Sequence, residues 1–198
     1  MPAPAAAARR RPEPVPRTFR WTRARYDAAV AAGVLTPHDK IELLDGHIIT
    51  KMPQGKPHRS ATLLVGAALR ETFAGVGFVQ EEKPVALSDG SEPEPDVAVV
   101  RGTIRDYLND HPGPDALLLL VEVAESSLGR DRALKAALYA RARVADYWIV
   151  NLADATLEVH RDPAPDGAYR TKTTLGPDDA VAPLARPDAR IPVADLLP

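Results

Sequence analysis

The spacing of apolar residues predicts two long helices separated by strands. Residues 58–73 carry Ala, Leu, Val and Phe at intervals of three and four, with charged residues on the other side and Gly75 soon after. Residues 128–141 show the same period behind two serines, Ser126 and Ser127, either of which suits a helix cap. This period is typical of amphipathic helices that pack one face against a sheet.

Short apolar runs predict the strands of that sheet. The clearest run is 117–124, eight residues bounded by Pro-Gly-Pro-Asp before it and by serines after it. A continuous run of this length is typical of a strand that is buried on both faces. Further strands are expected at residues 76–80, 84–87, 97–100, 145–150, 158–160 and 169–173.

The N-terminal part of the chain predicts a tail, a short helix and a hairpin. Residues 1–17 are rich in Pro, Ala and Arg and have no continuous apolar core, which favours a disordered or polyproline-like tail over a secretory signal. Thr22 suits an N-cap for a short helix. The Asp45-Gly46 pair between apolar runs indicates a hairpin over residues 41–51.

The order of these elements predicts one domain over residues 18–198. We therefore expect a mixed α/β architecture, in which helices cover both faces of a central sheet and the apolar residues of all these elements are buried between them. Residues 104–109 are expected to form a short helix or turn on a connecting loop. The Pro-rich segment from residue 176 onward has little periodicity, but its last apolar residues are expected to dock on the body: Ile191, Val193, Leu196 and Leu197.

Composition narrows the possible chemistry. Of the 198 residues, 45% are hydrophobic, none is Cys, and the net charge is -2. The absence of Cys excludes disulfides, thiol catalysis and thiolate-bound zinc, and fits a reducing cytoplasm. No stretch approaches the roughly 18 apolar residues of a membrane helix. The overall charge neither predicts nor excludes a polyanionic partner, so a nucleic-acid site has to come from local Arg clusters or from a metal ion.

One acidic residue, Glu122, lies within the apolar run 117–124. An ionised carboxylate left unpaired there is costly, so we expect a metal ion or a Lys to meet it. Asp96 opens another predicted strand, and Lys135 lies two turns into the helix after the run. Two carboxylates on adjacent strands can hold a divalent ion through oxygen ligands. A nearby ammonium can orient an attacking water or stabilise developing negative charge.

Each of these three residues also has a structural explanation. Glu122 suits a buried ion pair with Lys or Arg and no metal. Asp96 follows Pro95, a pair that is common in turns. Lys135 lies four residues after Asp131, a spacing at which the two side chains form a stabilising pair on one helix face.

Two further residues are candidates for a supporting role. His58 begins a predicted helix, where it either caps the helix or lies near a metal ion or a phosphate. Tyr139 is one turn after Lys135 and is interpreted as a core residue or a hydrogen-bond partner to the site. Six arginines are candidates for contacts with a nucleic-acid backbone, or else ordinary surface residues: Arg101, Arg105, Arg130, Arg132, Arg141 and Arg143.

Seven segments, in order, resemble the Uma-type family of putative restriction endonucleases, a branch of the PD-(D/E)XK nuclease superfamily. They are Ile41–Gly46, Pro57-His58, Pro95–Val99, Leu120–Val123, Arg130–Lys135, Leu138-Tyr139 and Asp146–Val150. The resemblance covers most of residues 22–159. It implies a restriction-endonuclease-like fold, in which a four-stranded mixed core sheet is flanked by helices. The N-terminal helix and hairpin and the C-terminal strands are additions to that core.

The resemblance also implies a catalytic site. Asp96 and Glu122 match the family's metal ligands and are expected to bind Mg²⁺ or Mn²⁺. Glu42 matches an upstream acid that is a further ligand of the ion, either directly or through a water molecule. The Lys that usually stands two residues after the Glu is replaced by Ala124, and Lys135 on the next helix is the matching residue. The function implied is hydrolysis of phosphodiester bonds in nucleic acid, with DNA as the expected substrate and a homodimer as the expected assembly. The alternative is a non-catalytic interaction or nucleic-acid-binding protein that keeps the nuclease fold.

Overall fold

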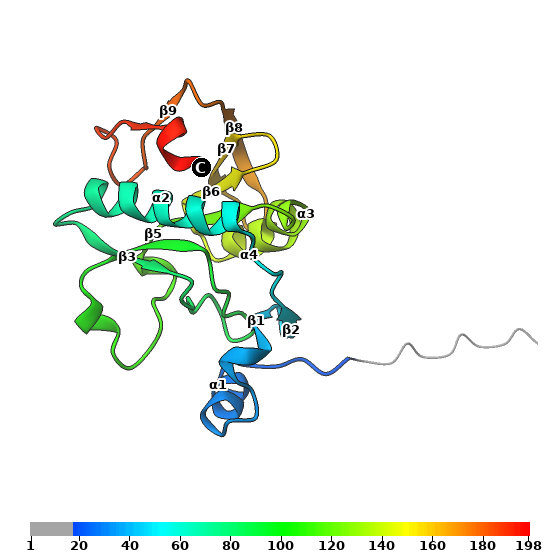
Figure 1. The fold of residues 1–198 in the computed structure, drawn as a ribbon. Helices are drawn as coiled ribbons and strands as arrows, with labels where there is room; N and C mark the ends of the chain where they lie inside the picture. The colour runs from blue at the N-terminus through cyan, green and yellow to red at the C-terminus, as the bar shows by residue number, and fades with distance from the viewer. Residues whose placement is uncertain (1–17) are drawn as a thin grey trace, which may run out of the picture.

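A six-stranded mixed sheet forms the centre of the molecule in the computed structural model, which describes residues 18–198 (Figure 1). The strands follow one another across the sheet in chain order, from β3 to β8. β5 and β6 are parallel, and every other neighbouring pair is antiparallel. The strands are β3 (Gly77–Glu81), β4 (Val97–Arg101), β5 (Leu117–Ala124), β6 (Asp146–Asn151), β7 (Thr156–Pro163) and β8 (Tyr169–Leu175). The predicted tail 1–17 lies outside the described residues.

Helices cover both faces of this sheet, as the pattern predicted. α2 (Lys56–Thr72) packs on one face. The opposite face is covered by α3 (Leu128–Arg130), a π-helical turn (Asp131–Lys135) and α4 (Ala136–Arg141), which follow one another without a break. Strand residues alternate between the two cores, as a pleated strand requires, except at Leu118 and Leu119 of β5, which both face the α2 side where the β4–β5 register shifts. The α2 side takes Val97, Val99, Val121, Val123 and Trp148, and the other side takes Ala98, Val100, Leu120, Tyr147 and Ile149.

The C-terminal segment docks beside α2, as its apolar residues predicted. It forms a two-stranded ladder of β9 (Ala180–Val181) and β10 (Ile191–Pro192), followed by a 3₁₀ turn over Val193–Leu196. Val193 and Leu196 are fully buried in the same core as α2.

The N-terminal part forms a separate layer of structure beside the main sheet. α1 (Arg23–Ala31) begins after Thr22, whose side chain accepts a hydrogen bond from the Arg25 backbone. β1 (Ile41–Leu44) and β2 (His47–Thr50) form the predicted hairpin. Its turn residues, Asp45 and Gly46, have φ angles of 48° and 74°, the left-handed pair that a tight two-residue hairpin turn requires. The hairpin is not part of the central sheet; it is joined to the body through a backbone pair between Leu43 and Glu92.

The prediction of a strand at residues 84–87 is wrong. Val85, Ala86 and Leu87 are buried, but in a loop rather than in a ladder. The backbone N–H of Val85 donates to Pro93 O, and that of Ala86 donates to Pro112 O. Because a proline has no N–H to return such a bond, these facing residues cannot complete a strand ladder.

The remaining predicted elements agree with the structure. Residues Ile104–Tyr107 form a short 3₁₀ turn, and β7 and β8 form a hairpin that extends the sheet beyond the implied four-stranded core, β3 to β6. No helix within residues 18–198 has the length and apolar character needed to cross a membrane.

Candidate active site

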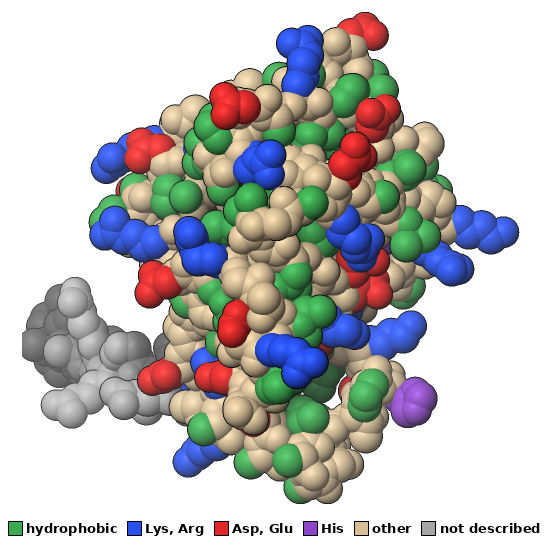
Figure 2. Space-filling view, turned by 90° about the vertical axis from the view of Figure 1, so that its left-hand side faces the viewer, with side chains coloured by type: hydrophobic (Ala, Val, Ile, Leu, Met, Phe, Trp, Pro, Cys, Tyr) green, Lys and Arg blue, Asp and Glu red, His purple; other side chains and the backbone are tan. Residues whose placement is uncertain are grey.

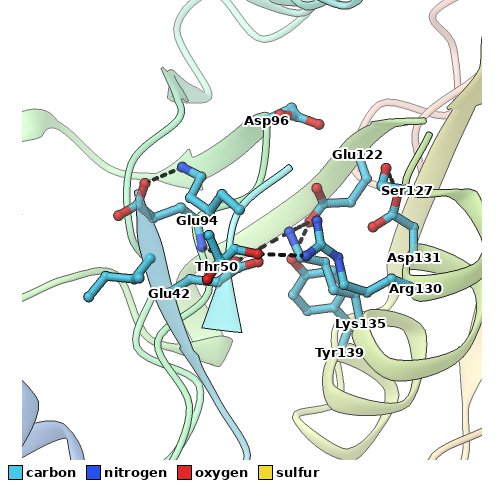
Figure 3. Close-up of polar contacts among 12 residues, drawn as sticks. Glu42, Thr50, Glu94, Asp96, Glu122, Ser127, Arg130, Asp131, Lys135 and Tyr139 are labelled. Atoms are coloured by element: carbon cyan, nitrogen blue, oxygen red, sulfur yellow. Dashed lines mark hydrogen bonds and ion pairs between the residues drawn. The ribbon is translucent and has the colours of Figure 1, made fainter. Parts of the chain in front are cut away.

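A cleft opens where the N-terminal hairpin, the start of α2, the edge of β4 and the helix after β5 approach one another (Figure 3). It has an empty volume of about 420 Å³, including the part that opens to solvent. We call it the acid cleft, because carboxylates dominate its charged lining: Glu42, Glu94, Asp96, Glu122, Glu125 and Asp131, against Lys51, Arg130 and Lys135.

Glu122 meets the cation that its burial requires, and this cation is Lys135. Glu122 belongs to β5, and the pleat points its side chain to the helix face of the sheet. Its Oε1 accepts a hydrogen bond from Lys135 Nζ at 2.9 Å and one from the Tyr139 hydroxyl at 2.5 Å. Burial raises the pKa of Glu122 well above its usual value, and the charge of Lys135 offsets only part of that effect. Tyr139 is therefore a hydrogen-bond partner within the site as well as a core residue.

Lys135 is shared between two carboxylates. Besides Glu122, its Nζ lies 3.4 Å from Glu42 Oε2, and its side chain is only 5% exposed. Burial lowers the pKa of Lys135, but the carboxylates of Glu122 and Glu42 outweigh this and raise it, so the ammonium stays charged. The alternative explanation, a pair between Lys135 and Asp131, does not hold: the Asp131 carboxylate instead accepts a hydrogen bond from the Ser127 hydroxyl. The physical reason is local, since the turn from Asp131 to Lys135 is π-helical and lacks the α-helical spacing on which that pair depends.

Glu42 reaches the cleft from the hairpin. It lies on β1 and is 1% exposed. Its Oε2 accepts the backbone N–H of Glu94 at 3.1 Å, while its Oε1 is buried and has no hydrogen-bond partner within the described residues. A buried carboxylate oxygen without a donor is uncommon in folded proteins and calls for a functional or solvent explanation.

Asp96 is held across the sheet rather than in a local turn. It directly precedes β4, and its Oδ2 accepts the backbone N–H of Val123 on β5 at 2.7 Å. His58, in the first turn of α2, places Nε2 3.3 Å from the same oxygen. Burial raises the pKa of Asp96, but the hydrogen bond and charge of His58 outweigh it, and the net pKa is lowered. His58 is thus a partner of Asp96, held in turn by the nearby Thr62 hydroxyl, rather than a helix cap.

Sequence reasoning missed one fully buried acid of the cleft, Asp131, and three more charged residues of its lining, Lys51, Glu94 and Glu125. Asp131 is 1% exposed, lines the cleft, and its Oδ2 lies 2.5 Å from the Ser127 hydroxyl. Burial raises the pKa of Asp131. Its position four residues before Lys135 suggested a surface pair, and only the fold shows that it faces inward. Ser127 does stand at the helix N-terminus, as expected, but its hydroxyl contacts Asp131 and not a backbone N–H.

A family model covers nearly the whole chain. The model, Uma2, is described as "Putative restriction endonuclease" and matches residues 27–194. The chain belongs to the Uma2 family. The match spans every residue that lines the acid cleft, from Glu42 to Lys135, and also Tyr139.

The fold is also found in a solved structure. The chain is similar to a "putative nuclease belonging to DUF820" from Anabaena variabilis ATCC 29413, with a TM-score of 0.62 and 17% sequence identity. The similarity covers 80% of this chain and 90% of that one, which establishes a shared fold. No curated protein matches the chain.

The donor chemistry of the acid cleft suits the divalent ion that the Uma2 resemblance implies. Carboxylate oxygens are the ligands preferred by Mg²⁺ and Mn²⁺, and Glu42 Oε1 is a buried oxygen that has no donor. Residues 18–198 contain no group of three or more His, Asp or Glu side chains already arranged around one point as a metal site. Instead, the ammonium of Lys135 lies between the carboxylates of Glu42 and Glu122. The cleft therefore has suitable donors, two of which a lysine neutralises in this structure.

Proposed function

We propose that this protein is a divalent-metal-dependent endonuclease that hydrolyses phosphodiester bonds in DNA. Its membership of the Uma2 family supports nuclease chemistry. The single observation that carries the proposal is the acid cleft itself, where Glu122 and Glu42 share one buried lysine and Asp96 lines the same opening. Burying several acids beside an opening to solvent lowers the stability of the fold. Clusters of this kind occur mainly at sites where the carboxylates bind a ligand or take part in a reaction.

In this proposal the carboxylates bind the ion and Lys135 acts on the substrate. Asp96 and Glu122 hold Mg²⁺ or Mn²⁺, and Glu42 supports them. The ion supplies Lewis-acid chemistry, because it neutralises charge on the phosphoryl group and acidifies water. The charged ammonium of Lys135 orients the attacking water or stabilises negative charge on the phosphoryl oxygens. His58 and Tyr139 fix the orientations of Asp96 and Glu122 through the contacts described above.

One observation favours a second candidate function. Lys135 neutralises Glu122 and Glu42 without a metal ion, which is the arrangement expected of a non-catalytic interaction or nucleic-acid-binding protein that retains the nuclease fold. The two candidates differ in whether a divalent ion can enter the acid cleft.

Metal binding and plasmid nicking together decide between them. We expect calorimetry to detect Mg²⁺ or Mn²⁺ binding to the wild-type protein, and a supercoiled plasmid to be nicked only when the ion is present. Glu122→Gln should abolish the binding and lower nicking by about a thousandfold, because it removes a charged ligand while keeping the side-chain shape.

The control is Glu158→Gln, a buried acid on β7 that pairs with Arg132 outside the acid cleft. This variant should bind the ion and nick the plasmid as the wild type does. If the wild-type protein binds no divalent ion at millimolar concentration and leaves the plasmid intact, the catalytic proposal is wrong and the non-catalytic candidate stands.

A further inference from the structure

The acid cleft has an excess of negative charge that a phosphodiester would have to overcome. Its lining contains six carboxylates but only three side chains that are permanently cationic. Two of these cations are already paired: Lys51 Nζ lies 2.6 Å from Glu94, and Lys135 is shared by Glu122 and Glu42. Arg130 is the cation of the lining for which the described residues provide no salt bridge.

The guanidinium of Arg130 is anchored yet incompletely bonded. Its Nη1 donates to the backbone oxygen of Thr50, at the end of β2, at 3.2 Å. Its Nε is buried and has no partner among residues 18–198. Figure 3 shows the side chain lying beside Lys135 and reaching toward Thr50 at the side of the acid cleft. One bond to a neutral carbonyl thus holds the group in place and leaves its charge and most of its donors unused.

Arg132, two residues later in the same predicted arginine cluster, differs from Arg130 because a carboxylate neutralises its charge. Its Nε and Nη2 both donate to the carboxylate of Glu158, which occupies its fork of donors. On the side of the molecule shown in Figure 2, basic and acidic side chains are interspersed without a continuous basic patch. Within the acid cleft itself, the cations available to a phosphate are those of the lining.

We propose that Arg130 is the residue that binds a phosphate of the DNA backbone next to the bond that is cleaved. The planar guanidinium suits two parallel hydrogen bonds to phosphate oxygens, and its carbonyl anchor orients it in advance. Arg130 contributes binding and position, while Lys135 and the carboxylates act at the reacting group. This inference rests on the proposed nuclease function, and it adds the residue by which the site holds its substrate.

Salt-dependent DNA binding tests the inference separately from catalysis. The probe is a fluorescein-labelled 20-base-pair duplex, titrated with protein by fluorescence anisotropy in EDTA, where no cleavage occurs. We expect Arg130→Gln to weaken binding about tenfold. It should also reduce the slope of log K against log[salt] by about 0.9, the value for one lost phosphate contact. Arg130→Lys should recover part of the affinity, because it restores the charge but not the fork.

The matched control is Arg190→Gln, which removes the same charge from an exposed arginine of the C-terminal segment. It should leave the salt slope unchanged. With plasmid and Mg²⁺, Arg130→Gln should raise KM and leave kcat near the wild-type value, since a contact made equally before and during the reaction affects binding alone.

The outcomes separate the two proposals. If the wild-type protein nicks DNA but Arg130→Gln matches Arg190→Gln in affinity and slope, the inference is wrong and the proposed function stands. If the wild-type protein never nicks DNA but its DNA binding depends on Arg130 as described, the proposed catalysis fails while the phosphate site is supported. A wild-type protein that neither binds the duplex nor nicks the plasmid overturns both.

Discussion

Two buried carboxylates of this protein are neutralised in different ways. Asp146, at the start of β6, is fully buried and accepts Trp148 Nε1 at 2.9 Å, Arg161 Nε at 2.8 Å and the backbone N–H of Leu184 at 2.8 Å. One oxygen of Glu42 accepts a backbone N–H and lies near Lys135, which also pairs with Glu122. The second oxygen of Glu42 has no donor within the described residues. The first arrangement satisfies the carboxylate, whereas the second leaves part of it without a partner.

This difference separates structural acids from candidate functional ones. The contacts of Asp146 join β6, β7 and the C-terminal segment, and they explain its burial completely. Within residues 18–198, each of the four acids buried at the cleft (Glu42, Asp96, Glu122 and Asp131) has at most two side-chain partners rather than three converging donors. Proteins tolerate such clusters where a function needs them, often at some loss of stability.

The largest effect on stability is expected at Asp146. Asp146→Asn places an amide group where three different donors converge and leaves Arg161 without its anionic partner. We expect the free energy of unfolding to fall by about 3 kcal/mol, the order of cost for breaking a buried ion pair. Urea denaturation measures this change. A loss below about 1 kcal/mol would contradict the structural role assigned to Asp146.

A smaller, pH-dependent effect is expected at His160 on β7. Burial and the charge of Lys172 lower the pKa of His160 below its usual value, although Glu158 acts in the opposite direction. The folded state therefore favours neutral His160. Its contribution to stability is present above the unfolded pKa of about 6.5 and is lost as the pH falls through the lower folded pKa.

The variant His160→Phe removes this titration and keeps a ring against Tyr147 and Tyr169. Urea denaturation at pH 7, 6 and 5 should show the wild-type protein losing more stability over this range than the variant does. Parallel curves for the two proteins would show that His160 does not contribute to the pH dependence.

The smallest effect on stability is expected at Glu42. Glu42→Gln loses an attraction to Lys135 but removes a buried charge from a cluster of acids, and Lys135 keeps its shorter contact with Glu122. We expect the free energy of unfolding to change by less than about 1 kcal/mol, because these two terms oppose each other. The urea midpoint measures the change. A loss as large as that of Asp146→Asn would remove the distinction between the two classes of acid.

The sequence was sufficient to predict most of the fold, because hydrophobic period and turn residues are local signals. The run 117–124 and the Asp45-Gly46 turn both identified their elements correctly. The segment 84–87 was misassigned because its burial depends on which loop faces it, and a local pattern does not contain that information.

The candidate site was only partly predictable from the sequence, for the same physical reason. An acid within an apolar strand is a local anomaly, so Glu122 could be identified and a cation inferred beside it. The inward position of Asp131 depends on a π-helical turn, for which the sequence offered no recognisable signal. The unpaired state of Arg130, in contrast to the paired Arg132, depends on the positions of carboxylates elsewhere in the fold.

The attachment of the N-terminal hairpin has a consequence for when the acid cleft is complete. The central sheet can pair all of its six strands without β1 and β2, yet Glu42 reaches the acid cleft only when Leu43 and Glu92 have joined the hairpin to the body. Contacts between segments so distant in sequence require the closure of a long loop. A chain whose sheet has formed before this closure lacks one carboxylate of the cleft. The acid cleft is therefore complete only in a chain whose hairpin has docked on the body.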